Sequence, residues 1–207
     1  MELSDAIRRR RMVRRYDPDR PVPDSAVLTC LEAAIRAPSA GFSQGWDFVV
    51  LRTPAQRAAF WEHATPPTAD GPPDRWLTGM QTAPVLIVCL SDPGTYLDRY
   101  AAPDKGWTDR DPARWPVPYW DVDTGMAALL MLLSAVDQGL GGLFFGVPPE
   151  CHAAVRSALG IPADRRLVGV VSIGYAAAHP KSPSLRRGRR GLDQVAHWGQ
   201  FGASAPR

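Results

Sequence analysis

The sequence predicts a single domain built from both helices and buried strands. Apolar runs of strand length occur at residues 46–52, 85–90 and 167–174, whereas in residues 24–35 the apolar positions recur on one helical face. Size gives a third observation, because 207 residues of which 45% are hydrophobic can bury one substantial core, either alone or as half of an intertwined dimer. We expect no second independent domain.

Capping residues, prolines and glycines mark where these elements begin and end. In chain order we expect a helix capped by Ser4, a helix capped by Asp24 or Ser25 and ended by Pro38, a strand at 46–52, a helix at 54–63, a proline- and glycine-rich segment at 65–74, a helix at 76–81, a strand at 85–90, a helix at 121–136, a strand at 143–145, a helix ending near Gly160 and a strand at 167–174.

Two segments of the central region stand out. Residues 91–120 form a long, irregular stretch rich in tyrosine and tryptophan, and we expect it to be an ordered lid or a pocket wall. The helix at 121–136 is apolar around most of its circumference, so it should be buried on nearly all sides, as the spine of a core or of a dimer interface.

Composition argues against several classes of protein. The formal charge of +3 is too small to identify a nucleic-acid-binding protein when the excess lies in two short runs. The three cysteines are far apart and lack CxxC spacing, so we expect buried free thiols and no metal site. The N-terminus lacks the pattern of a signal peptide, and no apolar run reaches the ~20 residues that span a bilayer. We therefore expect a cytoplasmic protein.

Arginine is concentrated in two places. Residues 8–16 read RRRRMVRRY, with six arginines in nine residues, and a second cluster at residues 184–193 lies in a tail that begins at about residue 179. By residue type alone, the first run could be a solvated face, a nucleic-acid patch or a phosphate site. A phosphate site would require the guanidinium groups to converge.

Four motifs together resemble the flavin-dependent nitroreductase family. They are the arginine run, PSAGFSQGWDF at residues 38–48, GLGGLFFG at residues 139–146 and RRGRRGLDQVAHW at residues 186–198, and together they cover nearly the whole chain in the family's order. The combination of PYWDVDTG, FFGVPPE and SLRRGRRGLD further resembles an actinobacterial-type subgroup.

The resemblance implies an α+β fold in which helices wrap a mixed sheet, assembled as an intertwined homodimer with two FMN sites at the interface. It implies an oxidoreductase that passes hydride from NAD(P)H through flavin N5 to a small acceptor, such as a nitroaromatic, a quinone or an enone. No catalytic triad or carboxylate pair is visible, which suits a reaction carried by the cofactor. The alternative is a flavin- or deazaflavin-binding protein without turnover.

The resemblance also assigns the cofactor-binding residues. An arginine is suited to the FMN phosphate because it offers paired donors and keeps its charge at neutral pH, and two arginine clusters would repel each other without an anion between them. The turn at residues 38–40 would approach the ring from the partner subunit, and the segment at 144–147 would lie along the ring. The assigned residues are Arg10, Arg11, Met12, Arg14, Pro38, Ser39, Ala40, Phe144, Phe145, Gly146, Val147, Arg187 and Arg189.

Three positions depart from the family's pattern. Met12 stands where a serine or threonine hydroxyl is common, Phe42 where asparagine is usual, and Gly45 where proline is usual. Within the arginine run, we expect Arg10 and Arg14 above all to bind phosphate, and Arg8, Arg9 and Arg15 to be solvated.

Overall fold

The computed structural model describes residues 1–66, 74–180 and 182–205. Its centre is a four-stranded sheet in the order β1-β2-β4-β3, in which each neighbouring pair is antiparallel. The parallel component expected of a mixed sheet is an isolated bridge between Met12 and Gly142. The strands are β1 (Trp46–Leu51), β2 (Val85–Ser91), β3 (Gly141–Phe145) and β4 (Arg166–Gly174).

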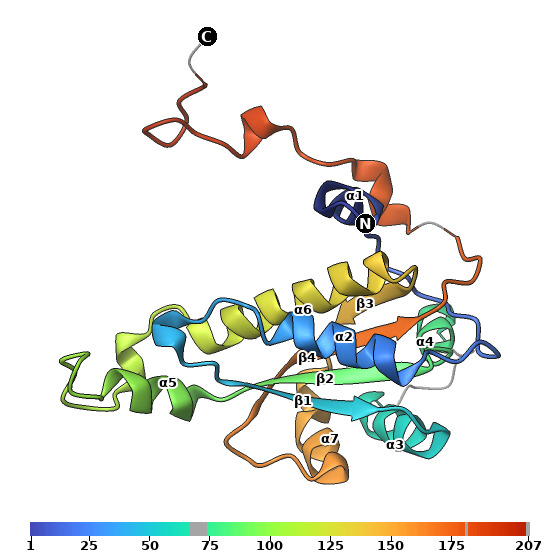
Figure 1. The fold of residues 1–207 in the computed structure, drawn as a ribbon, viewed down its shortest axis with the longest axis horizontal. Coiled ribbons are helices and arrows are strands. Elements are labelled where there is room, and N and C mark those ends of the chain that lie inside the picture. The colour runs from blue at the N-terminus through green and yellow to red at the C-terminus, as the bar shows by residue number, and fades with distance from the viewer. Residues whose placement is uncertain (67–73, 181, 206–207) are drawn as a thin grey trace.

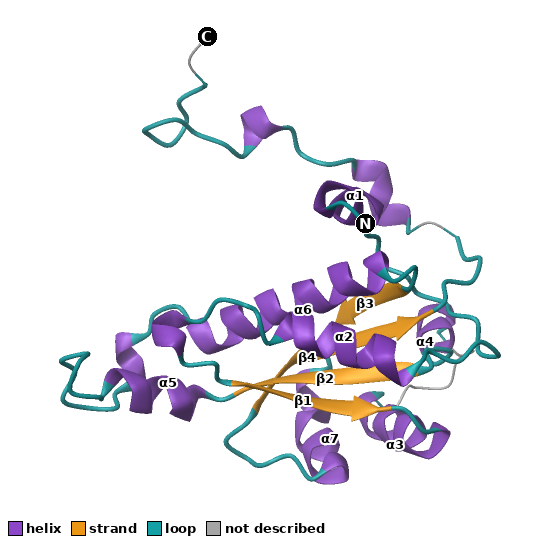
Figure 2. Cartoon of the chain, viewed as in Figure 1, coloured by secondary structure: helices purple, strands orange, loops and turns teal. Residues whose placement is uncertain are grey.

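Helices cover both faces of this sheet, as Figure 2 shows, which confirms the α+β fold. The longest helix, α6, lies with α2 against one face, and α3 and α7 lie against the other. Strand β2 is buried along its whole length because it meets both layers. The helices are α1 (Leu3–Arg9), α2 (Asp24–Ala34), α3 (Pro54–Ala64), α4 (Arg75–Met80), α5 (Pro93–Tyr100), α6 (Tyr119–Asp137) and α7 (His152–Leu159).

The expected strands and most of the expected helices are confirmed, but two predicted helix caps are wrong. Helix α1 begins after Glu2 and α2 after Pro23, and neither has a side-chain cap. Helix α2 also ends at Ala34, before Pro38. Most of the proline- and glycine-rich segment predicted at 65–74 lies outside the described residues.

Residues 91–120 are less irregular than expected. Asp92 caps α5 by accepting a hydrogen bond from the Thr95 amide, and the proline after it stands at the first helical position, so a helix start was readable here. Six aromatic rings of this region pack edge to face or tilted at centroid distances from 4.7 to 6.1 Å. The segment is therefore an ordered aromatic cluster, built from Tyr96, Tyr100, Trp107, Trp115, Tyr119 and Trp120.

The prediction that α6 is buried on nearly all sides is wrong for one chain. By length and composition this helix could cross a membrane, but 50% of its apolar window is buried inside the domain. On its outer side Val122, Met126 and Leu129 remain 36%, 42% and 48% exposed. Their spacing of four and three residues makes one stripe along the helix, which we call the apolar stripe.

The C-terminal tail leaves the body of the domain after β4 and ends away from the sheet (Figure 1). All described residues from 183 to 205 are exposed, including the apolar side chains of Leu185, Leu192 and Trp198. The three cysteines are free and buried, as predicted.

Candidate functional site

The arginine segment, residues 8–16, meets the edge strand β3 at Gly142 and then crosses to the residues that follow β4, where Tyr16 forms a bridge with Ala176. Met12 forms its bridge with Gly142, and the Val13 amide donates to the Gly142 carbonyl at 3.0 Å. A Cβ built on Gly141 would lie 2.7 Å from Val13 Cγ2, so a larger residue there would push the segment away. The glycine pair at the start of β3 thus permits this close approach.

Tyr16 fixes the register of the segment. Its ring is buried, and its hydroxyl lies 2.7 Å from Ser172 Oγ on β4 and 3.0 Å from the Val13 carbonyl. Burial raises the pKa of the Tyr16 hydroxyl above its ordinary value, so it stays a neutral donor. The arginines are therefore held on a backbone that is anchored at both ends of residues 12–16.

Positive charge gathers in this segment with little negative charge to balance it. Among the described residues, Arg8 is the one arginine of the run with an ion pair, to Asp5. Arg10 is half-buried, and its Nη1 is fully buried without a hydrogen-bond partner in the described part of the chain. Arg14, also half-buried, donates to the Met12 carbonyl at 3.3 Å. A bound anion would give Arg10 Nη1 the acceptor that it lacks among the described residues.

The departure at Met12 has a packing explanation. Its side chain packs against both core clusters, one on each face of the sheet. The residue can therefore serve a ligand only through its backbone, and a hydroxyl at this position would lose the packing. Arg11, in contrast, is exposed.

The segment at residues 144–147, which is predicted to lie along the flavin ring, includes the end of β3 and the residues after it. Phe145 and Val147 are buried in the core cluster of α3 and α7, and the Phe145 ring stacks on Trp61 with centroids 5.5 Å apart. Phe144 is half-buried on the other face, and Gly146 is exposed with open space around it. Phe145 and Val147 can thus offer a ligand their backbone, not their side chains.

The turn predicted at Pro38, Ser39 and Ala40 belongs to the loop at residues 38–45 and is held by a buried carboxylate. Asp123 Oδ2 accepts the Ala40 amide at 2.8 Å and the Tyr96 hydroxyl at 2.8 Å. Burial, followed by the hydrogen bond to Asp123, raises the pKa of Tyr96. Ser39 Oγ accepts the Gln44 amide at 3.0 Å and so closes the loop.

Sequence reasoning missed Asp123, which it interpreted only as a charge near a helix start. A carboxylate facing inward in an otherwise apolar helix was the available signal, because such a group is buried only when it is paired. It also missed Arg99, whose Nε donates to the Gly41 carbonyl at 3.0 Å.

The departure at Gly45 is explained by Tyr96. A Cβ on Gly45 would lie 2.6 Å from the Tyr96 ring and 2.9 Å from the Asp92 carbonyl. The absence of a side chain lets the aromatic cluster pack directly under the loop.

The structure does not bring all predicted site residues together in one chain. The loop is fastened at Asp123 near the start of α6, whereas the arginine segment meets β3 at Gly142, which packs beside Leu132 further along the same helix. The nine residue steps from 123 to 132 span about 13.5 Å of helix. Arg187 and Arg189 lie in the exposed tail, and no hydrogen bond joins them to the arginine segment among the described residues.

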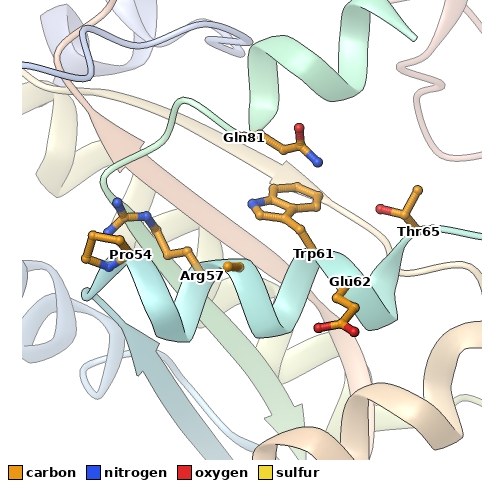
Figure 3. A pocket seen from close by; sticks show the side chains of 7 residues that line it. Pro54, Arg57, Trp61, Glu62, Thr65 and Gln81 are labelled. Carbon is orange, nitrogen blue, oxygen red and sulfur yellow. The ribbon is translucent and has the colours of Figure 1, made fainter. Parts of the chain in front are cut away.

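A hollow of about 650 Å³ lies elsewhere, along α3 (Figure 3). Arg57 lines it and donates to the Pro84 carbonyl at 2.9 Å, and burial lowers the pKa of this guanidinium. None of the predicted site residues lines this hollow, which is formed by Pro54, Arg57, Ala58, Trp61, Glu62, Thr65 and Gln81.

Two known proteins are similar in sequence to most of this chain. An NADH dehydrogenase of Thermus thermophilus is 30% identical over 217 residues, 96% of each protein. A protein of Archaeoglobus fulgidus whose name combines NADH dehydrogenase with NAD(P)H nitroreductase is 30% identical over 168 residues, 80% of each.

Solved structures share the fold over nearly the whole chain. A structure from Exiguobacterium sibiricum, described as a nitroreductase in complex with FMN, has a TM-score of 0.74 at 20% identity and covers 96% of this chain and 97% of its own. An FMN-dependent nitroreductase of Clostridium difficile has a TM-score of 0.68 at 21% identity, covering 95% and 98%. The nitroreductase family profile matches residues 7–175, and the chain therefore belongs to the nitroreductase family.

Proposed function

We propose that the chain is an FMN-dependent oxidoreductase that uses NAD(P)H and works as a homodimer in the cytoplasm. The observation that carries this proposal is the Arg10 guanidinium, whose buried Nη1 has no partner among the described residues. A native protein rarely leaves such a group unpaired, and a bound phosphate would pair it. Membership of the nitroreductase family, and relatives named for NAD(P)H chemistry, support the same conclusion.

The site suits FMN in particular because positively charged arginines lie next to the backbone of an extended strand. The positions of Gly142 and Gly146 lie four residues apart on β3 and its continuation, which corresponds to about 13 Å. A ligand with its phosphate at Arg10 and Arg14 could lie along this edge and reach the exposed backbone at Gly146. There, a backbone N–H could stabilise negative charge on the ring.

The apolar stripe on α6 supports the proposed dimer. Leu28 of α2 and Ile35 directly after it are also 57% and 55% exposed, so apolar side chains point outward beside the stripe as well. Such a surface is normally covered by a partner. A two-fold axis across the stripe would pair two α6 helices in antiparallel orientation. The loop of one copy would then lie beside the arginine segment of the other, and each site would be completed by both chains.

When bound, FMN would accept hydride from the nicotinamide and pass it to a nitroaromatic, quinone or enone acceptor. The chain's own part is positional. Arg10 and Arg14 would hold the phosphate, the loop at residues 38–45 would cover the ring from the second copy, and the aromatic cluster would exclude water beside it. Arg187 and Arg189 would complete the phosphate site from the tail.

Absorbance spectroscopy of the purified protein tests the proposal. We expect FMN to be taken up with a stoichiometry of one per chain, and to be bleached by NADH or NADPH and restored by a quinone. A protein that takes up no FMN would contradict the proposal, and FMN uptake without turnover would assign the chain to flavin storage instead.

Substitutions locate the phosphate. Arg10→Ala and Arg14→Ala should each weaken FMN binding by about 1.5 to 3 kcal/mol, the contribution of a hydrogen bond to a charged group. Binding of riboflavin, which lacks the phosphate, should change little. Arg15→Ala is the matched control, because Arg15 is exposed; an equal loss in all three variants would remove the assignment.

A further inference from the structure

Phe42 is an anomaly in the loop at residues 38–45. Its side chain is 76% exposed, although it is a large apolar ring. Its backbone has a φ of 55°, and Gln44 has a φ of 56°; these are the two non-glycine residues with positive φ in the part of the chain that the structure describes. A left-handed conformation costs a side-chain-bearing residue about 1 to 2 kcal/mol. Such strain persists at ligand-binding sites, where its surroundings enforce it.

The surroundings of Phe42 do enforce this conformation. The Phe42 amide donates to the Ser39 carbonyl at 2.9 Å, and Ser43 Oγ donates to the Ala40 carbonyl at 2.7 Å. Arg99 holds the Gly41 carbonyl and is itself fixed by two hydrogen bonds to Asp104, of 2.7 and 2.6 Å. The ring is therefore presented on a rigid loop, and ordering it on binding costs little entropy.

The position of the ring is set by its neighbour. Gly41 sits so close to the aromatic cluster that a Cβ would lie 2.8 Å from the Tyr100 ring. Phe42 follows immediately, at the end of the domain where α5 and the loop lie (Figure 1). In the antiparallel dimer, this end faces the arginine segment and the exposed Gly146 of the second copy.

We propose that Phe42 is a specificity-determining residue that stacks on planar aromatic electron acceptors in the flavin site of the second copy. This inference rests on the proposed function. An anchor for the dimer interface would need no strained backbone, since an apolar residue in an ordinary conformation would serve equally well. A ring held at a fixed height over a cofactor requires a rigid support, and offset stacking favours planar aromatic molecules over saturated ones.

The substitutions Phe42→Asn and Phe42→Tyr separate the ring from the strain. Asparagine tolerates the left-handed conformation well but removes the aromatic face, whereas tyrosine keeps the face and the strain. Binding to the oxidised FMN-loaded dimer is followed by the change in flavin absorbance, with 1-naphthol as a planar, non-reducible probe and cyclohexanol as its saturated counterpart.

We expect Phe42→Asn to weaken 1-naphthol binding about tenfold, the size of one aromatic stacking contact, and Phe42→Tyr to restore it. Cyclohexanol binding should stay the same in all three proteins. Turnover should follow the same order, with menadione affected and ferricyanide, which needs no stacking, unaffected.

Equal 1-naphthol affinities in the wild type and Phe42→Asn would overturn the inference. So would a loss that accompanies dissociation of the dimer in sedimentation, because Phe42 would then be an interface anchor. Failure of the proposed function is distinguishable, since the wild type itself would then show no flavin absorbance.

Discussion

The two ends of α6 differ in whether the buried polar groups beside them have hydrogen-bond partners. At the loop end, the buried Asp123 carboxylate accepts hydrogen bonds from the half-buried Ala40 amide and the buried Tyr96 hydroxyl. At the arginine end, Arg10 buries a guanidinium nitrogen that has no partner among the described residues. Because unpaired buried groups are costly, the first arrangement stabilises the domain by itself, whereas the second is complete only with a ligand. The loop end therefore fixes the conformation of residues 38–45, and the arginine end would bind the phosphate.

The substitution Asp123→Ala tests whether the loop end is stabilised by its own hydrogen bonds, and we expect it to have the largest effect. It leaves the Ala40 amide and the Tyr96 hydroxyl without their acceptor, and each unpaired buried donor costs about 1 to 3 kcal/mol. We expect the free energy of unfolding to fall by about 2 to 5 kcal/mol in urea denaturation. Asp137→Ala, on the exposed end of the same helix, should cost less than about 1 kcal/mol. Similar losses in the two variants would refute the structural role of Asp123.

Gly45→Ala tests how tightly the loop sits on the aromatic cluster. The added Cβ would contact the Tyr96 ring and the Asp92 carbonyl at less than 3.0 Å, and overpacking of this kind costs about 1 to 3 kcal/mol. Gly146→Ala is the control at the arginine end, where a Cβ meets open space, and its unfolding free energy should change by less than about 0.5 kcal/mol. A loop that accepts the Gly45→Ala substitution without loss of stability would have to be mobile.

The substitution Arg10→Met tests whether the arginine end needs a ligand to pair its buried charge. Without ligand, this variant should be as stable as the wild type or slightly more stable, because it removes a buried charge that has no partner among the described residues. With FMN present, the wild type should gain stability and the variant should gain much less. Thermal unfolding with and without FMN measures both effects. A destabilised ligand-free variant would make Arg10 a structural residue.

We expect the smallest effect from loss of the ion pair between Arg99 and Asp104 at low pH. The hydrogen bond from Arg99 lowers the pKa of Asp104 from 3.8 to about 2. A lowered pKa stabilises the folded state above the ordinary value, and this contribution is lost as the pH falls from 3.8 towards 2. Tryptophan fluorescence should report the release of the segment around Trp107, and Asp104→Asn should abolish that transition. A transition that persists in Asp104→Asn would have another origin.

Prediction from the sequence succeeded where local pattern is enough. The continuous apolar run of β2 is readable because a central strand must be apolar on both faces. The helix α5 was missed although Asp92 and Pro93 mark its start and Tyr96 and Tyr100, four residues apart, share one helical face. The cap of α2 was wrong because Pro23 begins that helix by its backbone conformation alone.

By itself, the sequence determined the order of elements, the family and the two basic clusters. Tertiary structure alone decided which of the adjacent residues Arg10 and Arg11 turns inward, because the bridge between Met12 and Gly142 sets the direction of each side chain. It also decided that Asp123 accepts the amide of Ala40, which lies 83 residues away along the chain. Contacts between residues so far apart in the sequence depend on how the helices pack on the sheet, and local sequence spacing does not predict them.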